Sequence, residues 1–187
     1  MIKYLLRLVL CALFVVGGQT SSFAQSAARV VKRAAKELKS EGWKAVDGRG
    51  QIEEQMLELV TRQLDETDGL PRYISGTRTA SARDFVTART LAFAQAKSDI
   101  AGQIKSEVSS ICDAVCGDRV LSDNQTVQID SMVESATVSV SRNIGSVDTI
   151  VELYRTLSPD CFEVRVTLTY DTEEMKTEIM RICSSSN

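Results

Sequence analysis

One long amphipathic helix constrains the fold of this chain more than any other stretch of its sequence. Between Ser81 and Ile111, apolar or small residues recur about every 3.7 positions, close to one turn of an α-helix. The stripe that they form consists of Phe85, Ala88, Ala92, Ala96, Ile100, Ile104, Val108 and Ile111. Ser81 and Asp84 have capping-box spacing, which predicts that the helix begins at Ser81. Because such a stripe must be buried, we expect the rest of the chain to lead to this helix or to cover it.

The N-terminal residues are typical of a secretory signal peptide. Lys3 and Arg7 precede a short apolar run, residues 8–16, and small residues before residue 25 predict cleavage after Ala24. A transmembrane helix needs about 20 apolar residues, and this run is shorter. Cys11 lies inside the apolar run and follows a bulky leucine, which argues against a lipid anchor. We therefore expect a periplasmic or secreted protein without a transmembrane span after signal removal.

Composition excludes several classes of function. The 187-residue chain has a net charge of −3 and lacks a clear basic cluster in its sequence, so we expect no nucleic-acid partner. It contains no histidine, which removes the usual general base of hydrolases and the commonest zinc ligand. We expect no cofactor, and any hydrolase chemistry would depend on carboxylates alone.

The hydrophobic patterns predict an α+β fold with a small antiparallel sheet of about three strands. Residues 25–70 are expected to form a helical segment, and residues 71–187 an α+β domain that makes one compact unit with that segment. A strand over residues 72–79 precedes the long helix, and Gly76 in it marks a bulge or the close approach of another backbone. A helix over residues 121–144 is expected to return antiparallel to the long helix. The predicted elements that follow are a hairpin of strands 147–155 and 162–170, and a final helix, residues 171–182.

The N-terminal segment contains two predicted helices, over residues 27–38 and 51–66. Gly42 stands where the first helix would end, and Trp43, beside that end, is interpreted as a packing cap over the core. The first helix has a basic side that could contact an anionic membrane. Glu37 and Glu41 interrupt that side, which favours a merely solvated face.

Four cysteines follow the predicted cleavage site, and an even number in an oxidising compartment indicates disulfides. Of the three possible pairings, we favour Cys112 with Cys116, because i and i+4 near a helix end come close to bridging distance. We pair Cys161 with Cys183 because the last strand and the last helix are neighbours in sequence. A redox-active dithiol would have two residues between its cysteines rather than three. A four-cysteine zinc site would need reduced thiolates in an oxidising space, so neither alternative is favoured.

Acidic residues supply the remaining candidate sites. Glu53, Glu54 and Glu58 could be drawn as a metal site, but they alternate with basic residues on a helix surface, which favours a solvated face and no metal. For a carboxylate enzyme, the nominal catalytic candidates are Asp84, Glu152 and Glu163. The sequence predicts no pocket that would perturb them, so we expect no catalytic residue and no enzyme.

The run Ala88-Arg89, Ala92, Ala96, Asp99-Ile100-Ala101, Ile104, Val108 lies between a glycine-containing strand and a second helix with a β-hairpin. This arrangement resembles the domain of the twenty-kilodalton bacterial surface lipoproteins and the N-terminal domain of flagellar assembly protein T. Residues 41–45 also look like a segment of uncharacterised secreted proteins from Gram-negative envelopes. The resemblance, over residues 72–170, implies an α+β envelope module without catalytic residues.

These observations predict a non-enzymatic module of the cell envelope that acts through self-assembly or a protein partner. A free strand edge can accept a strand from a partner, and the alternating strand Cys161 to Tyr170 is the expected edge. The alternatives are a carboxylate-based enzyme and a disulfide or metal module.

Overall fold

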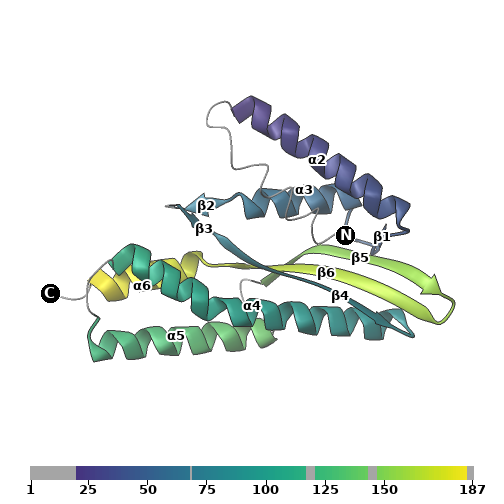
Figure 1. Cartoon of the computed structure of the whole chain (residues 1–187). Helices are drawn as coiled ribbons and strands as arrows, with labels where there is room; N and C mark the ends of the chain where they lie inside the picture. Colours follow the sequence, from purple (N-terminus) through teal and green to yellow (C-terminus); the bar gives the residue numbers. More distant parts are fainter. Residues whose placement is uncertain (1–19, 68, 117–120, 143–146, 185–187) are drawn as a thin grey trace.

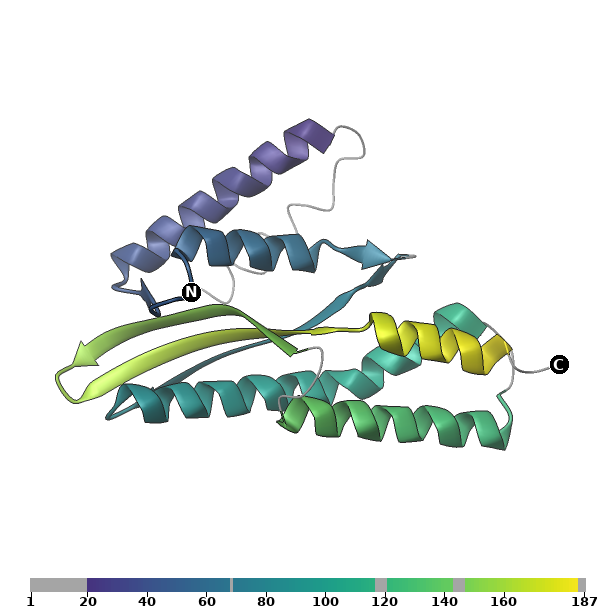
Figure 2. The same cartoon turned by 180° about the vertical axis from the view of Figure 1, so that it is seen from behind.

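The computed structural model describes residues 20–67, 69–116, 121–142 and 147–184, and Figure 1 shows their arrangement. A four-stranded antiparallel sheet, of strand order β1-β5-β6-β4, lies between two helical layers. Helices α2 and α3 cover one face, and α4, α5 and α6 lie on the other side (Figures 1 and 2). The fold is therefore α+β as predicted, with four strands in the sheet rather than about three.

The elements occur in the predicted order, with bounds that differ from the prediction by up to seven residues. They are α2 (Thr20–Ser40), β1 (Lys44–Ala45), α3 (Ile52–Gln63), β4 (Tyr73–Ala82), α4 (Phe85–Cys116), α5 (Asp123–Arg142), β5 (Val147–Ser158), β6 (Cys161–Asp171) and α6 (Glu173–Ser184). A second, two-stranded sheet pairs β2 (Glu66–Thr67) with β3 (Leu70–Pro71) and was not predicted. The predicted signal peptide, residues 1–24, lies mostly outside the described residues, which begin at Thr20 within α2.

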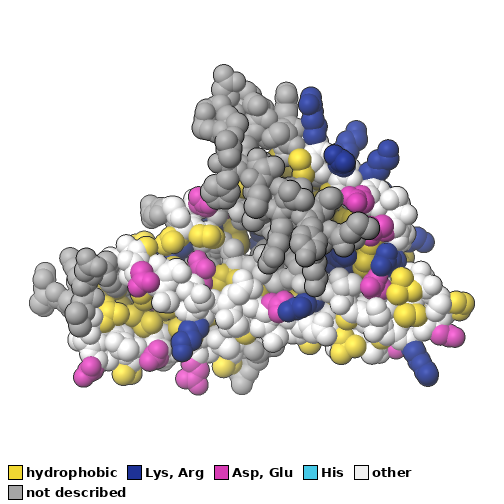
Figure 3. All heavy atoms as spheres, in the orientation of Figure 1, with side chains coloured by type: hydrophobic (Ala, Val, Ile, Leu, Met, Phe, Trp, Pro, Cys, Tyr) yellow, Lys and Arg dark blue, Asp and Glu magenta, His cyan; other side chains and the backbone are white. Residues whose placement is uncertain are grey.

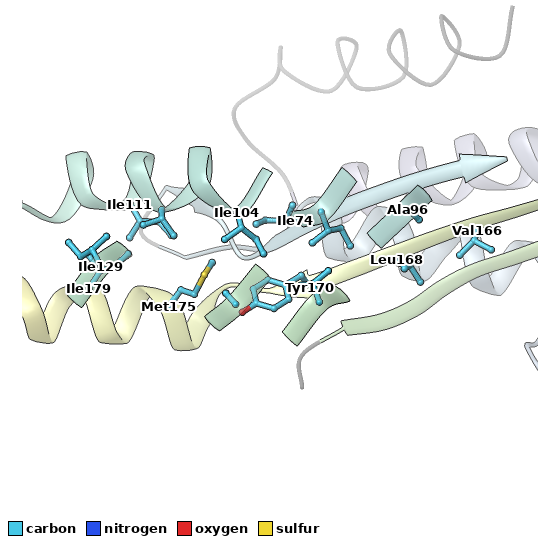
Figure 4. Close-up of a cluster of buried hydrophobic side chains, with 14 of the residues drawn as sticks. Ile74, Ala96, Ile104, Ile111, Ile129, Val166, Leu168, Tyr170, Met175 and Ile179 are labelled. Carbon is cyan, nitrogen blue, oxygen red and sulfur yellow. The ribbon is translucent and has the colours of Figure 1, made fainter. Parts of the chain in front are cut away.

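The stripe of the long helix α4 is the centre of the core. From Ala88 to Ile111 its members are 0–2 % exposed. They pack on β4 and β6, and farther along on α5 and α6. In Figure 4, Ile104 and Ile111 of α4 lie near Met175 and Ile179 of α6. The stripe therefore lies against β4 and β6, and not against the β5–β6 hairpin as a unit.

Gly76 of β4 marks the closest approach of sheet and helix. A Cβ atom at this position would lie 2.4 Å from the carbonyl oxygen of Ala96, far inside van der Waals contact. Small residues on both elements thus allow their backbones to touch. Of the two roles predicted for Gly76, the close approach is confirmed. The β4–β6 register runs without a bulge.

The start of α4 differs from the prediction. Strand β4 continues to Ala82, so Ser81 is paired with Glu163 of β6 and does not cap the helix. Asp84 takes that role, because one of its carboxylate oxygens accepts a hydrogen bond of 2.8 Å from the backbone N–H of Thr87. The capping-box spacing placed the helix start four residues too early and assigned the cap to Ser81 rather than Asp84.

The end of α2 is confirmed in detail. Gly42 has a φ of +85°, the left-handed conformation that glycine adopts without strain. The N–H of Trp43 donates to the carbonyl of Leu38, and that of Gly42 to Lys39, which together form a Schellman motif. Trp43 is 2 % exposed and packs in a second core with α2, α3 and β5. It is a packing cap, as predicted.

Strand β6 is central, between β5 and β4. The prediction that Cys161 to Tyr170 forms a free edge is wrong, because the sequence pattern of a half-buried strand does not reveal its position in the sheet. The edge strands of this sheet are the two-residue β1 and the ten-residue β4.

Candidate functional site

A buried carboxylate on β5 is the most unusual polar feature of the sheet. A bulge follows Thr149, after which Val151 and Leu153 point toward α2 and α3. The intervening Glu152 therefore points toward the α4 side, and its side chain is fully buried. Burying a carboxylate is costly unless it is paired, so its partners decide its role.

Two arginines from different elements hold Glu152. The Nε of Arg49, in the turn between β1 and α3, lies 2.9 Å from one carboxylate oxygen, and the Nε of Arg89, on α4, contacts the other. The hydrogen bond to Glu152 raises the pKa of Arg89. The Arg89 guanidinium also lies over the ring of Phe93, 4.7 Å from its centroid. We call these three residues the Glu152 clamp.

The backbone of Glu152 is bonded in the same region. Its N–H donates to the side-chain oxygen of Gln55 at 2.8 Å, and its carbonyl accepts from the N–H of Val46 at 3.2 Å. Gln55, 4 % exposed, also donates to the carbonyl of Gly50. The clamp and these bonds together attach the β1–α3 turn to the edge of β5.

An open polar groove of about 500 Å³ lies beside the clamp, between α3 and the start of β5. Arg62 crosses it and contacts Glu58 at 2.9 Å, Asp148 at 2.7 Å and the hydroxyl of Thr169 at 2.9 Å. Partial burial would lower the pKa of Arg62, but its bonds to Asp148 and Glu58 outweigh that and raise it. The charged groups of the groove thus largely neutralise one another.

The structure does not bring the three nominal catalytic residues together. Asp84 caps α4, and the hydrogen bonds from Thr87 lower the pKa of its carboxylate. Glu163 contacts Arg155 at 2.5 Å on the α2 side of the sheet, whereas Glu152 lies on the α4 side. Each of the three carboxylates has a separate structural partner, so they form no acid–base pair.

The three glutamates of α3 that could be drawn as a metal site, Glu53, Glu54 and Glu58, have other partners. Glu53 contacts Lys39 at 2.7 Å, which lowers the pKa of Glu53, and Glu54 accepts from the backbone N–H of Gln51. Within the described residues, no group of three histidine, cysteine or acidic side chains could hold a metal ion.

Trp43 forms a second unusual cluster, on the other face of the sheet. The guanidinium groups of Arg155 and Arg165 lie 4.7 and 4.6 Å from the centroid of its ring. Burial lowers the pKa of Arg165, whose Nε donates to the hydroxyl of Thr79. Among the described atoms, the indole N–H of Trp43 has no partner, but it is fully buried and out of reach of a ligand.

Neither of the two predicted disulfides is formed in the structure. Cys112 and Cys161 are free, whereas Cys183 is disulfide-bonded, and the side chain of Cys116 lies outside the described part of the structure. Helix α4 continues through residue 116, and i, i+4 positions on a helix keep their Cβ atoms about 5–6 Å apart, too far for a disulfide. Cys161 is the first residue of β6 and Cys183 is the last residue but one of α6, so nearly the length of both elements separates them (Figure 1).

Sequence reasoning missed Arg49, Arg89 and Gln55, the partners of Glu152. Arg89 directly follows Ala88 of the apolar stripe, which was a weak signal that it lies at the boundary of the core. Arg49 and Gln55 reach Glu152 from a turn and a helix about 100 residues away in sequence. No local pattern could have identified them.

No protein-family model, curated protein or solved structure matches this chain. The resemblance to envelope domains therefore stays a prediction. Of the helices that the structure describes, none is long and apolar enough to cross a membrane.

Proposed function

We propose that this chain is a non-enzymatic envelope module, secreted or periplasmic, that acts by strand pairing with a protein partner or with a second copy. The observation that supports the proposal is the free edge of β4, a ten-residue strand with a partner on one side only. Within β4 there is no proline or lysine, residues that often protect an edge from pairing.

Hydrogen bonds across the sheet identify which β4 groups face outward. Both backbone groups of Glu152 bond away from β6, so those of Val166, opposite it, point toward β4. Arg78 is opposite Val166 and bonds inward. By alternation, the N–H and C=O groups of Thr77 and Thr79 point outward.

The rest of β4 agrees with this assignment. The side chain of Gln103, on α4, donates to the carbonyl of Ser75, two residues before Thr77. That carbonyl is thus on the outer side as well. Thr77, Thr79 and Ser81 are exposed, and no backbone partner is described for their outward groups. They offer a short row of donors and acceptors to an incoming strand.

A proline at position 79 tests the proposal. Thr79→Pro removes an outward N–H without removing a bond to β6, and Thr79→Ala, which loses the same hydroxyl contact with Arg165, is the matched control. We expect self-association, measured by light scattering, or capture of a partner from envelope extract to be lost in Thr79→Pro and kept in Thr79→Ala. A monomer without a partner, or equal association of both variants, would contradict strand pairing.

A further inference from the structure

The exposed face of α2 carries a concentration of positive charge in a chain that is acidic overall. The helix contains five basic residues and one acidic residue, Glu37, whereas the whole chain has a net charge of −3. Four of the basic residues, which we call the basic face, are all exposed: Arg29, Lys32, Arg33 and Lys36. Figure 3 shows Lys and Arg side chains gathered over this helix.

The basic face is not neutralised within the molecule. Among the described residues, none of its four members forms an ion pair, although ion pairs are common elsewhere in the structure. The nearby carboxylates have other partners: Glu53 contacts Lys39 at 2.7 Å, and Glu41 is turned toward Arg155 at 3.9 Å. Of the two residues that interrupt the basic side in sequence, only Glu37 remains near it.

The basic face also works against the stability of its own helix. Arg29 is three and four residues from Lys32 and Arg33, and Lys36 is four and three residues from the same pair. Like charges at these spacings repel each other and destabilise a helix. Glu37, four residues from Arg33, and Glu53, which interacts electrostatically with Lys32, offset part of this repulsion, but no ion pair between either of them and the basic face is described. The remaining repulsion favours an anionic partner outside the molecule.

The opposite side of α2 rules out insertion of the helix into a bilayer. Val31, Ala35 and Leu38 are 0–7 % exposed and pack in the core with α3 and β5. The basic face extends over eight residues, about 10 Å of a straight helix. Helix α2 lies on the outside of its layer (Figure 2). The geometry suits a flat anionic surface that is contacted by charge alone.

We infer that the basic face of α2 binds the anionic headgroups of a phospholipid membrane. The lipid is favoured over nucleic acid because α2 closely follows the apolar run of residues 8–16, which is predicted to bring this part of the chain to a membrane during export. Lysine and arginine side chains near an anionic bilayer each add to attraction, which salt weakens. Binding through α2 leaves β4, on the far side of α3, open to a protein partner.

Co-sedimentation of the purified full chain with vesicles tests this inference. We expect binding to phosphatidylglycerol–phosphatidylcholine vesicles at about 0.01 M salt, and its loss at about 1 M salt, where the Debye length is about 3 Å. Vesicles of phosphatidylcholine alone should not bind. Lys32→Gln with Lys36→Gln should weaken binding about 30-fold, and should leave the melting temperature unchanged or raised because two repulsive charges are gone.

The matched control is Arg83→Gln with Lys105→Gln, which changes net charge equally at two exposed residues outside α2. It should bind within about twofold of the original chain, since the attraction depends on charges near the surface. Equal weakening by both double variants would overturn the inference. Binding to phosphatidylcholine vesicles that salt does not weaken would also overturn it, because the N-terminal apolar run would then be the membrane-binding segment. Tighter binding to a DNA duplex than to the anionic vesicles, lost in the α2 variant, would assign the face to nucleic acid instead. None of these outcomes depends on the β4 edge, so this test and the strand-pairing test fail separately.

Discussion

At the scale of single residues, the Glu152 clamp joins three elements through one buried carboxylate. Because Arg49 and Arg89 are each about 40 % exposed, they can return to water if Glu152 is removed, whereas Glu152 itself cannot. The loss of folding free energy should therefore be larger when the two arginines are removed than when Glu152 is removed. All the charged groups of the clamp are paired, and the clamp joins the β1–α3 turn and α4 to β5. Its role is therefore structural.

Loss of both arginines is the most damaging change to the clamp. Arg49→Ala with Arg89→Ala leaves Glu152 buried and unpaired, and should lower the free energy of unfolding by about 3–5 kcal/mol in urea titrations. Adding Glu152→Met should recover most of that loss, because an apolar side chain needs no partner. If the triple variant were no more stable than the double variant, the carboxylate would not be the source of the cost.

The alanine stripe of α4 is equally sensitive to charge. Ala96 is 0 % exposed and faces Gly76, so Ala96→Asp buries an unpaired carboxylate and should cost more than about 4 kcal/mol, enough to unfold a marginal domain. Ala92→Asp, equally buried, should behave the same way. Ala94→Asp, on the exposed side of the same helix, is the control and should leave the circular dichroism spectrum unchanged. A folded Ala96→Asp variant would show that the wrong face has been placed in the core.

At the scale of elements, the start of α4 depends on one charged cap. The carboxylate of Asp84 accepts from the backbone N–H and the hydroxyl of Thr87, which lowers its pKa below the ordinary value of 3.8. A carboxylate with a lowered pKa in the folded state stabilises the fold above its ordinary pKa, and the effect is lost as the pH falls through the lowered value.

Asp84→Asn isolates the charge of this cap. Asparagine keeps the capping geometry but carries no charge toward the positive end of the helix. We expect the variant to melt at a lower temperature than the original chain near pH 7, with the difference shrinking below about pH 4. Asp160→Asn is the control, at an exposed turn residue for which no ion pair is described, and it should leave the melting temperature near pH 7 unchanged.

At the scale of the whole molecule, the cysteines predict a specific oxidation state. With Cys112 and Cys161 free and Cys183 bonded, the chain should lose two hydrogens on oxidation, measured by intact mass with and without reductant. Alkylation without reductant should label both free thiols, more slowly at Cys112, because burial raises the pKa of its thiol. Loss of four hydrogens would instead support two disulfides.

The sequence by itself determined the elements of this protein and the inner face of its central helix. The 3.7-residue stripe, the strict alternation in β6 and the glycine after α2 are local patterns, and local periodicity reports which side of an element is buried. A glycine within a predicted strand also indicated the close contact at Gly76. For the same reason, the bounds of most elements agree with the structure to within a few residues.

Only the tertiary structure decided which partners those elements and side chains have. Strand order placed β6 at the centre of the sheet and left β4 at the edge, and strand order depends on contacts between distant segments. Glu152 is bonded to Arg89 and Arg49, which are 63 and 103 positions away in sequence. Glu41 pairs with Arg155 and not with the basic face of α2. Pairing between distant residues has no periodicity to read, so the clamp, the free cysteines, the open edge and the unneutralised face of α2 became visible only in the folded chain.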